Sequence, residues 1–357
     1  MDNEPTHHDP PPGVLRIIDA AANRAGEGLR VIEDYLRFVL DDRHLTERCK
    51  TLRHDLTAAL APISNSDRNT SREASRDVGA ELTTDDEKSR GDVAHVVCAS
   101  FKRLEQSLRS LEEYTKLFDP AISATLERLR FCTYTLERAV DITRCSIQRL
   151  GTCRLYVLIG AQETPEQFEA LAQSLIAGGA GAIQLRHKNR GDKHLTDDKL
   201  LQRARLLRRM TRDSDTLFFV NDRPDIAVLA GADGVHVGQD ELSVKDARTI
   251  VGPRCLIGVS THTIEQARGA VLDGANYIGC GPTFPSRTKQ FDDFPGVDFL
   301  QQVAAEIRLP AFAIGGISPE NLPQVRAAGF NRVAVSAAVT GHDDPGQAAR
   351  QLLTALA

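Results

Sequence analysis

The sequence predicts an α/β protein in which an all-α helical bundle precedes a C-terminal (β/α)8, or TIM, barrel. The chain has 357 residues, which is more than one hydrophobic core normally supports, so two domains are expected. Its first part shows long stretches with apolar residues three and four positions apart, which is the helical period. From Gly151 onward, short β-branched runs alternate with helix-length stretches eight times. Such even repetition is typical of a closed parallel barrel.

The N-terminal part divides into a tail and a helical domain. Residues 1–13 are polar and proline-rich, a composition that buries too little apolar surface to order the chain. Residues 14–150 form the predicted helical domain, to which the sequence assigns no function. Its expected helices cover residues 14–40, 45–60, 93–117 and 122–142. Residues 64–91 are rich in Ser, Asp, Arg and Thr and are predicted to form a long loop.

Residues 151–357 form the predicted barrel. Its expected strands are residues 154–159, 182–186, 217–221, 234–237, 256–260, 277–281, 311–315 and 332–336. An open doubly wound sheet is the alternative, and the missing GxGxxG after the first strand disfavours it.

Composition narrows the function classes. Hydrophobic residues make up 41% and charged residues 26% of the chain, and no apolar run is long enough to span a membrane. The net charge of −5 is spread over interspersed acids and bases, so neither nucleic acid nor a membrane is an expected partner. The seven cysteines form no CxxC pair, which favours a cytoplasmic protein without disulfides or thiolate zinc. The sequence leaves a homo-oligomer open.

Polar residues end several predicted strands, where the active site of such a barrel lies. Alternation points Gln184, Arg186 and Lys188 to the interior, which predicts a ligand site, with an internal ion-paired layer as the alternative. Asp222 and Glu241 follow the two next strands, and carboxylates placed in this way can hold Mg²⁺ together with a polyphosphate. Taken alone, Asp222 could instead cap the following helix.

The last three strands predict a lid and a phosphate site. Residues 281–296 form the longest predicted loop of the barrel and carry hydroxyls and cations between Gly and Pro residues, as substrate lids do. Gly315 and Gly316 end the seventh strand, and Val335 and Ser336 end the eighth. Bare backbone amides and a following helix can bind a phosphate monoester there.

Seven segments, in order, resemble the thiamine-phosphate synthase family. That family's pattern runs through QxRxK, ND, GVHxGQ, GVSxHT, GPxFPTxTK, GGI and VSAA-like segments. This chain has QLRHK at 184–188, ND at 221–222, GVHVGQ at 234–239, GVSTHT at 258–263, GPTFPSRTK at 281–289, IGGI at 314–317 and VSAA at 335–338. The resemblance covers essentially the whole predicted barrel, and the helical part resembles an extension found on some longer members.

The resemblance implies a transferase that joins a hydroxymethylpyrimidine diphosphate to a carboxythiazole phosphate and releases pyrophosphate. It implies a pyrimidine diphosphate site formed by Gln184, Arg186, Lys188, Asn221, Ser260 and Lys289, of which Arg186, Lys188, Ser260 and Lys289 are the expected catalytic residues. It implies Mg²⁺ on Asp222 and Glu241. It also implies that Ser286 and Thr288 contact the thiazole, whose phosphate rests on Gly316, Val335 and Ser336.

Two positions depart from the family pattern, which usually has Asp where Glu241 stands and Thr where Ser286 stands. Both departures keep the functional group. The implied reaction needs no protein nucleophile, so Cys280 is predicted to be a packed barrel residue. His187, His236 and His262 lie inside the motifs, where packing or hydrogen bonding is at least as good an explanation as catalysis.

Two other functions remain open. A thiazole tautomerase, a barrel relative, would not need the diphosphate and Mg²⁺ residues. A non-catalytic sensor of thiamine precursors would use the helical part as an interaction module. The presence of Arg186, Lys188, Asn221, Asp222 and Lys289 favours the synthase over both.

Overall fold

The computed structural model describes residues 10–73, 90–162, 164–187, 195–285 and 295–356. The chain divides into two compact units, Met1–Val140 and Asp141–Ala357. No helix in the described ranges is both long and apolar enough to cross a membrane.

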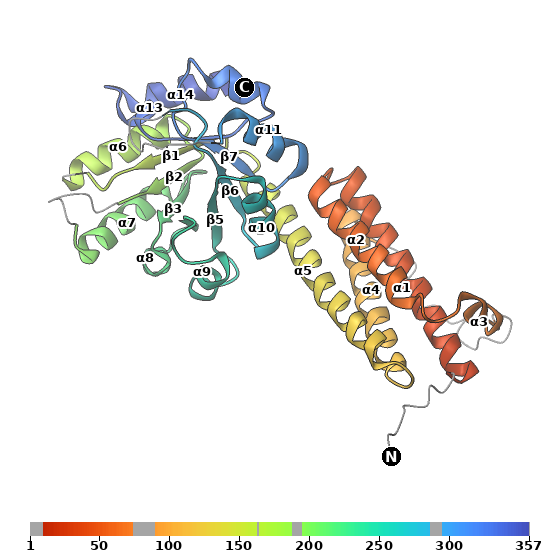
Figure 1. Ribbon diagram of the computed structural model, residues 1–357. Coiled ribbons are helices and arrows are strands. Elements are labelled where there is room, and N and C mark those ends of the chain that lie inside the picture. Colours follow the sequence, from red (N-terminus) through yellow and green to blue (C-terminus); the bar gives the residue numbers. More distant parts are fainter. Residues whose placement is uncertain (1–9, 74–89, 163, 188–194, 286–294, 357) are drawn as a thin grey trace. The chain divides into compact units, whose positions relative to one another are not determined.

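The first unit is a bundle of long helices, as predicted (Figure 1). It contains α1 (Pro12–Phe38), α2 (Arg43–Leu60), α4 (Val93–Thr115) and the first part of α5 (Pro120–Leu150). Helices α1 and α4 approach closely at Gly28, where a Cβ atom would lie 3.1 Å from the backbone oxygen of Ser100. Their shared core is aliphatic, with Leu29 and Leu104 almost fully buried.

The predicted loop between the second and third long helices is partly wrong. A short helix, α3 (Asn65–Thr70), begins there. Its cap explains it, because the Ser64 side chain accepts a hydrogen bond from the Asp67 backbone N–H at 3.2 Å, which satisfies a donor that the first turn leaves open. Residues 74–89 of the same segment lie outside the described ranges.

Buried carboxylates tie the bundle together. Glu112 of α4 is 3% exposed and accepts from Arg130 of α5 at 2.8 Å. Glu33 of α1 is equally buried and accepts from Arg53 of α2 at 3.3 Å. Each pair joins two helices, and removing one partner would leave an uncompensated buried charge.

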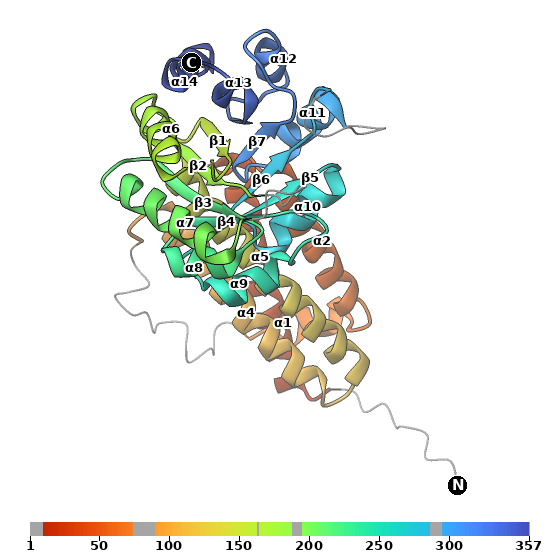
Figure 2. The same cartoon turned by 90° about the vertical axis from the view of Figure 1, so that its left-hand side faces the viewer.

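The second unit is a closed barrel of eight parallel strands in the order β1-β2-β3-β4-β5-β6-β7-β8. The strands are β1 (Leu155–Ile159), β2 (Ala182–Leu185), β3 (Leu217–Asn221), β4 (Gly234–Val237), β5 (Leu256–Thr261), β6 (Tyr277–Cys280), β7 (Ala311–Ile314) and β8 (Val333–Val335). The helices between and after them are α6 (Pro165–Ala177), α7 (Asp197–Thr211), α8 (Pro224–Ala230), α9 (Val244–Val251), α10 (Ile264–Asp273), α11 (Gly296–Glu306), α12 (Leu322–Ala327), α13 (Ala337–Thr340) and α14 (Pro345–Leu356). They surround the strands (Figures 1 and 2). The barrel prediction is confirmed, and pairing of β1 with β8 excludes an open sheet.

Aromatic rings fill the barrel interior. Tyr156, Phe219, Tyr277 and Phe312 belong to one buried cluster, and the Phe219 and Tyr277 ring centroids lie 5.3 Å apart. Space for these rings comes from a glycine on a neighbouring strand. A Cβ atom at Gly258 would lie 2.0 Å from the Tyr277 ring, so this position tolerates no side chain unless the ring moves.

The C-terminal end of α5 closes the barrel where the strands begin. Leu150 and Cys153 belong to the interior cluster. The fully buried Ser146 hydroxyl oxygen accepts from the Asn276 amide at 3.1 Å, and Arg149 donates to the Arg254 backbone oxygen at 2.7 Å. The open end of the barrel is therefore the end where the strands finish.

Gly258→Ala should destabilise the barrel, because the added methyl group has to displace the Tyr277 ring. We expect a loss of roughly 3 kcal/mol in the free energy of unfolding, measured by urea unfolding together with hydrogen exchange of β5 and β6. Gly269→Ala is the matched control, since a Cβ atom there has nothing within 4 Å. Equal stability of the two variants would contradict this packing account.

The predicted domain boundary at residue 151 stays a prediction, which two truncations test. A chain that begins at Asp141 keeps Ser146 and Leu150, whereas one that begins at Gly151 loses both. We expect the free energy of unfolding of the shorter chain to be lower by about 3 kcal/mol. In that chain Leu150 no longer packs at the end where the strands begin, and Asn276 loses its hydrogen bond to Ser146. Thermal unfolding of the two barrels would check this, and equal melting temperatures would show that the end of α5 is dispensable.

Candidate active site

The polar residues predicted at the strand ends lie at the open end of the barrel. Gln184 is 1% exposed and Asn221 is 9% exposed. Each lies two positions after a residue of the interior cluster, Ala182 or Phe219, so strand alternation places both side chains in the interior. Arg186 follows β2 directly, and its backbone N–H donates to the Ile159 oxygen at 2.8 Å. Strands β2 to β5 thus bring Gln184, Asn221 and Ser260 to the same end of one closed sheet.

A continuous chain of side-chain hydrogen bonds runs through the interior from β2 to β5. Gln184 Nε2 donates to the Tyr156 hydroxyl at 3.1 Å, and the Tyr156 and Tyr277 hydroxyls are 2.8 Å apart. The Tyr277 hydroxyl lies 3.1 Å from His236 Nδ1. His236 Nε2 lies 3.0 Å from the Ser260 hydroxyl. We call these five residues the interior relay.

Burial fixes the protonation of the relay. It raises the pKa of the Tyr277 hydroxyl well above its ordinary value, and likewise that of Tyr156. Burial, reinforced by the nearby Arg186 charge, lowers the pKa of His236 to about 4. At neutral pH both tyrosines therefore keep their protons, and the imidazole of His236 is neutral with a single N–H.

Side chains of the GVHVGQ and GVSTHT motifs also bind a backbone oxygen of the motif that follows each of them. The Gln239 side-chain amide donates to the Ser260 backbone oxygen. The ring of His262 bonds the backbone oxygen of Gly281 through Nδ1. The Ser260 side chain and backbone are thus both held by the β4 segment.

Asp222 occupies an unusual backbone conformation. Its φ of 59° lies in the left-handed region, which costs most residues about 1 kcal/mol or more but which Asp and Asn tolerate. The Asp222 N–H donates to the His236 oxygen at 2.8 Å, and its carboxylate accepts from the Asn221 amide. The N-cap of α8 is Arg223, with no side-chain cap, so Asp222 does not cap this helix.

Glu241 lies on the loop after β4, the strand that pairs with β3, and its side chain is exposed. Its carboxylate lies over Gly238, where a Cβ atom would be 2.0 Å from Glu241 Oε2. No group of three or more His, Cys, Asp or Glu side chains within the described ranges forms a metal site. Mg²⁺ often needs only one or two protein carboxylates, with substrate phosphates and water completing its shell. Asp222 directly follows β3 and Glu241 lies in the loop after the neighbouring strand β4, and both carry the carboxylate oxygens that such a site uses.

The glycine pair after β7 packs against the start of the predicted lid. Gly315 and Gly316 have φ values of 96° and 65°, which favour glycine. A Cβ atom at Gly315 would lie 2.7 Å from Pro282, and one at Gly316 would lie 2.6 Å from the Phe284 oxygen. The Asn321 amide donates to the Gly316 oxygen at 2.8 Å. This loop start and the glycine pair therefore form one surface.

Ser336 follows β8 at the head of the short helix α13. Its hydroxyl donates to the Leu158 backbone oxygen at 2.9 Å, which ties β8 to β1, while the residue itself is exposed. Val335 is buried. Four other predicted site residues, Lys188, Ser286, Thr288 and Lys289, lie outside the described ranges.

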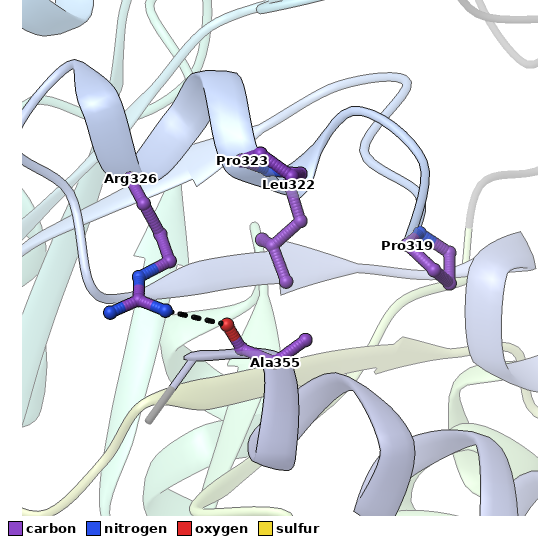
Figure 3. Close-up of a pocket in the computed structure, with 5 residues that line it drawn as sticks. All are labelled: Pro319, Leu322, Pro323, Arg326 and Ala355. Carbon is purple, nitrogen blue, oxygen red and sulfur yellow. Dashed lines mark hydrogen bonds between the residues drawn. The ribbon is translucent and has the colours of Figure 1, made fainter.

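A surface pocket lies elsewhere, between α12 and α14 (Figure 3). It measures ≈ 290 Å³ and is lined by Pro319, Leu322, Pro323, Arg326 and Ala355. Two of these lining residues are joined by a hydrogen bond, which Arg326 donates to the Ala355 backbone oxygen at 3.2 Å. None of the strand-end residues lines this pocket, so we do not assign substrate binding to it.

Two relay members were not predicted from the sequence. Tyr156 and Tyr277 belong to β1 and β6, and the strand pattern by itself does not distinguish them from the apolar residues around them. A buried tyrosine hydroxyl normally needs a hydrogen-bond partner. Two tyrosines at inward strand positions are therefore the sequence signal that indicates a polar network inside the barrel.

Substitutions at Asp222 should separate backbone strain from chemistry. Asp222→Asn should keep the free energy of unfolding within about 0.5 kcal/mol of the original chain, because Asn also tolerates φ near 59°. Asp222→Val should lose about 1–2 kcal/mol, measured by denaturant unfolding. Equal losses in both variants would mean that the carboxylate, not the backbone, sets the stability.

Comparisons with known proteins cover both parts of the chain. The model of the family described as thiamine monophosphate synthase matches residues 155–339, and that of the ThiD2 family matches residues 16–139. A thiamine-phosphate synthase of Rhodopirellula baltica is 45% identical over 92% of this chain and 89% of its own length. One from a Synechocystis species is 41% identical over 97% of each chain. The solved structure of thiamine phosphate pyrophosphorylase from Pyrococcus furiosus superposes with a TM-score of 0.52 at 32% identity, covering 58% of this chain and 97% of that one. With this identity over nearly its whole length, the chain belongs to the thiamine-phosphate synthase family.

Proposed function

We propose that this chain joins 4-amino-2-methyl-5-(diphosphooxymethyl)pyrimidine to a carboxythiazole or hydroxyethylthiazole phosphate, forming thiamine phosphate and releasing pyrophosphate, together with CO₂ when the acceptor is the carboxythiazole phosphate. The structural observation that best supports this proposal is the Gln184 side chain, which forms one end of the interior relay. Gln184 is 1% exposed, and its Oε1 atom is buried without a hydrogen-bond partner among the residues that the structure describes. An unpaired buried acceptor costs about 1–3 kcal/mol, and the amino group of the pyrimidine is a donor that removes this cost.

The pyrimidine site takes in both the interior and the rim of the barrel. Gln184, Asn221 and Ser260 bind the pyrimidine ring at the strand ends. Arg186 supplies positive charge to the diphosphate at the rim. Lys188 and Lys289 belong to the same proposed set and lie outside the described ranges.

The reaction breaks the bond between the pyrimidine methylene and the diphosphate oxygen. The bonding electrons leave with pyrophosphate, and the electron-rich aminopyrimidine stabilises the cation that remains. The thiazole nitrogen then donates its lone pair to the methylene carbon. The protein contributes by holding the two partners in line and by stabilising the departing charge.

Asp222 and Glu241 would hold Mg²⁺ against the diphosphate. The bound ion supplies Lewis-acid stabilisation of the leaving group. Arg186, with Lys188 and Lys289, adds fixed positive charge beside the same oxygens. We thus propose that the acidic residues bind the diphosphate through Mg²⁺ and that the cationic residues bind it directly.

The thiazole phosphate is proposed to bind on the other side of the open end. Its phosphate would rest on Gly316, Val335 and Ser336, where β7 and β8 finish. The exposure of Ser336, at the start of α13, supports this position. Ser286 and Thr288 are proposed to contact the thiazole ring and lie outside the described ranges. We further propose a cytoplasmic enzyme whose partners are these small molecules.

An assay of the full chain with both substrates and Mg²⁺ tests the function. We expect thiamine phosphate and pyrophosphate to appear in equal amounts and a chelator to stop both. Asp222→Asn should lower turnover by about 100-fold or more with folding preserved. Asp273→Asn, which removes an exposed carboxylate paired with Lys245, should leave turnover unchanged.

Three outcomes would overturn parts of the proposal. Aromatisation of the thiazole phosphate without condensation would identify a tautomerase. Binding of both compounds without turnover would identify a sensor. Full activity of Asp222→Asn at limiting Mg²⁺ would remove Asp222 from the metal site.

A further inference from the structure

We propose that Tyr156, Tyr277 and His236 are positioning residues that select the amino form of the pyrimidine over its deaminated, oxo form. They do so by coupling Gln184 to Ser260, so that one end of the interior relay presents an acceptor and the other a donor. The inference rests on the proposed binding of the pyrimidine by Gln184 and Ser260.

The relay contains a fixed number of protons. Each tyrosine hydroxyl donates one hydrogen, the neutral His236 ring donates one, and the Ser260 hydroxyl donates one. Gln184 Nε2 donates to Tyr156 at 3.1 Å. Because Tyr156 is buried at 2% exposure, its own hydrogen also needs an acceptor, and Tyr277 at 2.8 Å provides it.

The direction of the remaining links then follows. Tyr277 accepts from Tyr156, so its hydrogen goes to His236 Nδ1 at 3.1 Å. The single ring proton of His236 therefore lies on Nε2 and is donated to the Ser260 oxygen at 3.0 Å. The Ser260 hydrogen is left to donate to a ligand, while Gln184 Oε1 is left to accept from one.

The opposite direction is also self-consistent but less favourable. It requires the Gln184 amide to turn over, so that its NH₂ group becomes the unpaired end and Ser260 becomes an acceptor. Gln184 and Arg186 lie two residues apart on β2 and its extension, on the same side of the strand. The Arg186 charge acts on this part of the barrel, since it contributes to the lowered pKa of His236, and a positive charge on that side of the strand favours an amide oxygen over an amide NH₂ group at the unpaired end of Gln184.

An acceptor at one end and a donor at the other complement an aminopyrimidine. Its amino group donates hydrogen bonds, and its ring nitrogens accept them. Deamination replaces the amino group with a carbonyl and places a proton on a ring nitrogen, which reverses both requirements. The oxo compound can bind only if every link of the relay reverses or if buried groups stay unpaired, and sites of this kind discriminate strongly.

Packing prevents the individual side chains of the relay from moving to form other hydrogen bonds. The Tyr277 ring lies against Phe219, Phe312 and His236 at centroid distances of 5.3, 5.7 and 5.5 Å. Gly258 provides the space that the ring occupies. The hydroxyl oxygens are thus held in place, and the direction of the hydrogen bonds is the variable that remains.

The His236 tautomer is a direct test on the free full-length protein. Labelling histidine with ¹⁵N and assigning His236 by the signal lost in His236→Gln distinguishes the two ring nitrogens by their chemical shifts. We expect the proton on Nε2 in the original chain. A proton on Nδ1 would show that the relay runs in the other direction and would overturn the proposal.

Ligand preference is the second test. We would measure the affinities of the 4-amino and 4-oxo pyrimidinylmethyl monophosphates, which cannot release pyrophosphate. The original chain should prefer the amino compound by about 10-fold or more. Tyr277→Phe removes the central link and keeps the ring, so this preference should fall below about 3-fold. Phe312→Leu disturbs the ring contacts of Tyr156 and Tyr277 but removes no hydrogen bond of the relay, so it should keep the original preference despite lower stability.

Variants at the two ends distinguish failure of the relay from failure of the site. If Gln184→Leu and Ser260→Ala lose the preference but Tyr277→Phe keeps it, the relay is wrong and the proposed site stands. If the end variants bind the amino compound as tightly as the original chain does, the site assignment is wrong and the relay falls with it.

Discussion

The structure of this barrel depends on fitting polar side chains into a closed, densely packed interior. A tyrosine hydroxyl buried among aromatic rings must find a partner, and Tyr277 finds two, Tyr156 and His236. The ring itself fits only because Gly258 has no side chain. Packing and hydrogen bonding therefore constrain the same few positions, Gly258 and Ser260 in one short motif and His236 in the motif before it.

Backbone conformation imposes a comparable constraint at the open end of the barrel, where the strands finish. Asp222 takes a left-handed conformation at the end of β3, and its N–H is fixed on the β4 strand. Gly238 leaves room for the Glu241 carboxylate, and Gly315 leaves room for Pro282. Several motif residues thus fix the backbone conformation at the strand ends. They thereby position the side chains that are proposed to bind substrate.

The sequence predicted the barrel well because its signals are local. Each strand is a short β-branched run, and all eight were found within a residue or two of their ends. Alternation also identified Gln184 as an interior residue. The relay could not be predicted in this way, since Gln184 and Tyr156 are 28 positions apart and Tyr156 and Tyr277 are 121 apart. The helix α3 was missed because its stability comes from a cap and not from apolar periodicity.

The interior also explains why the proposed chemistry works by positioning. Cys280, beside the loop after β6, is fully buried, and burial raises the pKa of its thiol to about 12, so it is not a nucleophile at neutral pH. The relay tyrosines keep their protons, and His236 stays uncharged beside Arg186. Condensation needs neither a covalent intermediate nor a strong base, because pyrophosphate leaves with its electrons and the thiazole nitrogen supplies the new bonding pair. Such a reaction is compatible with a site whose tyrosine hydroxyls and imidazole keep one fixed protonation state.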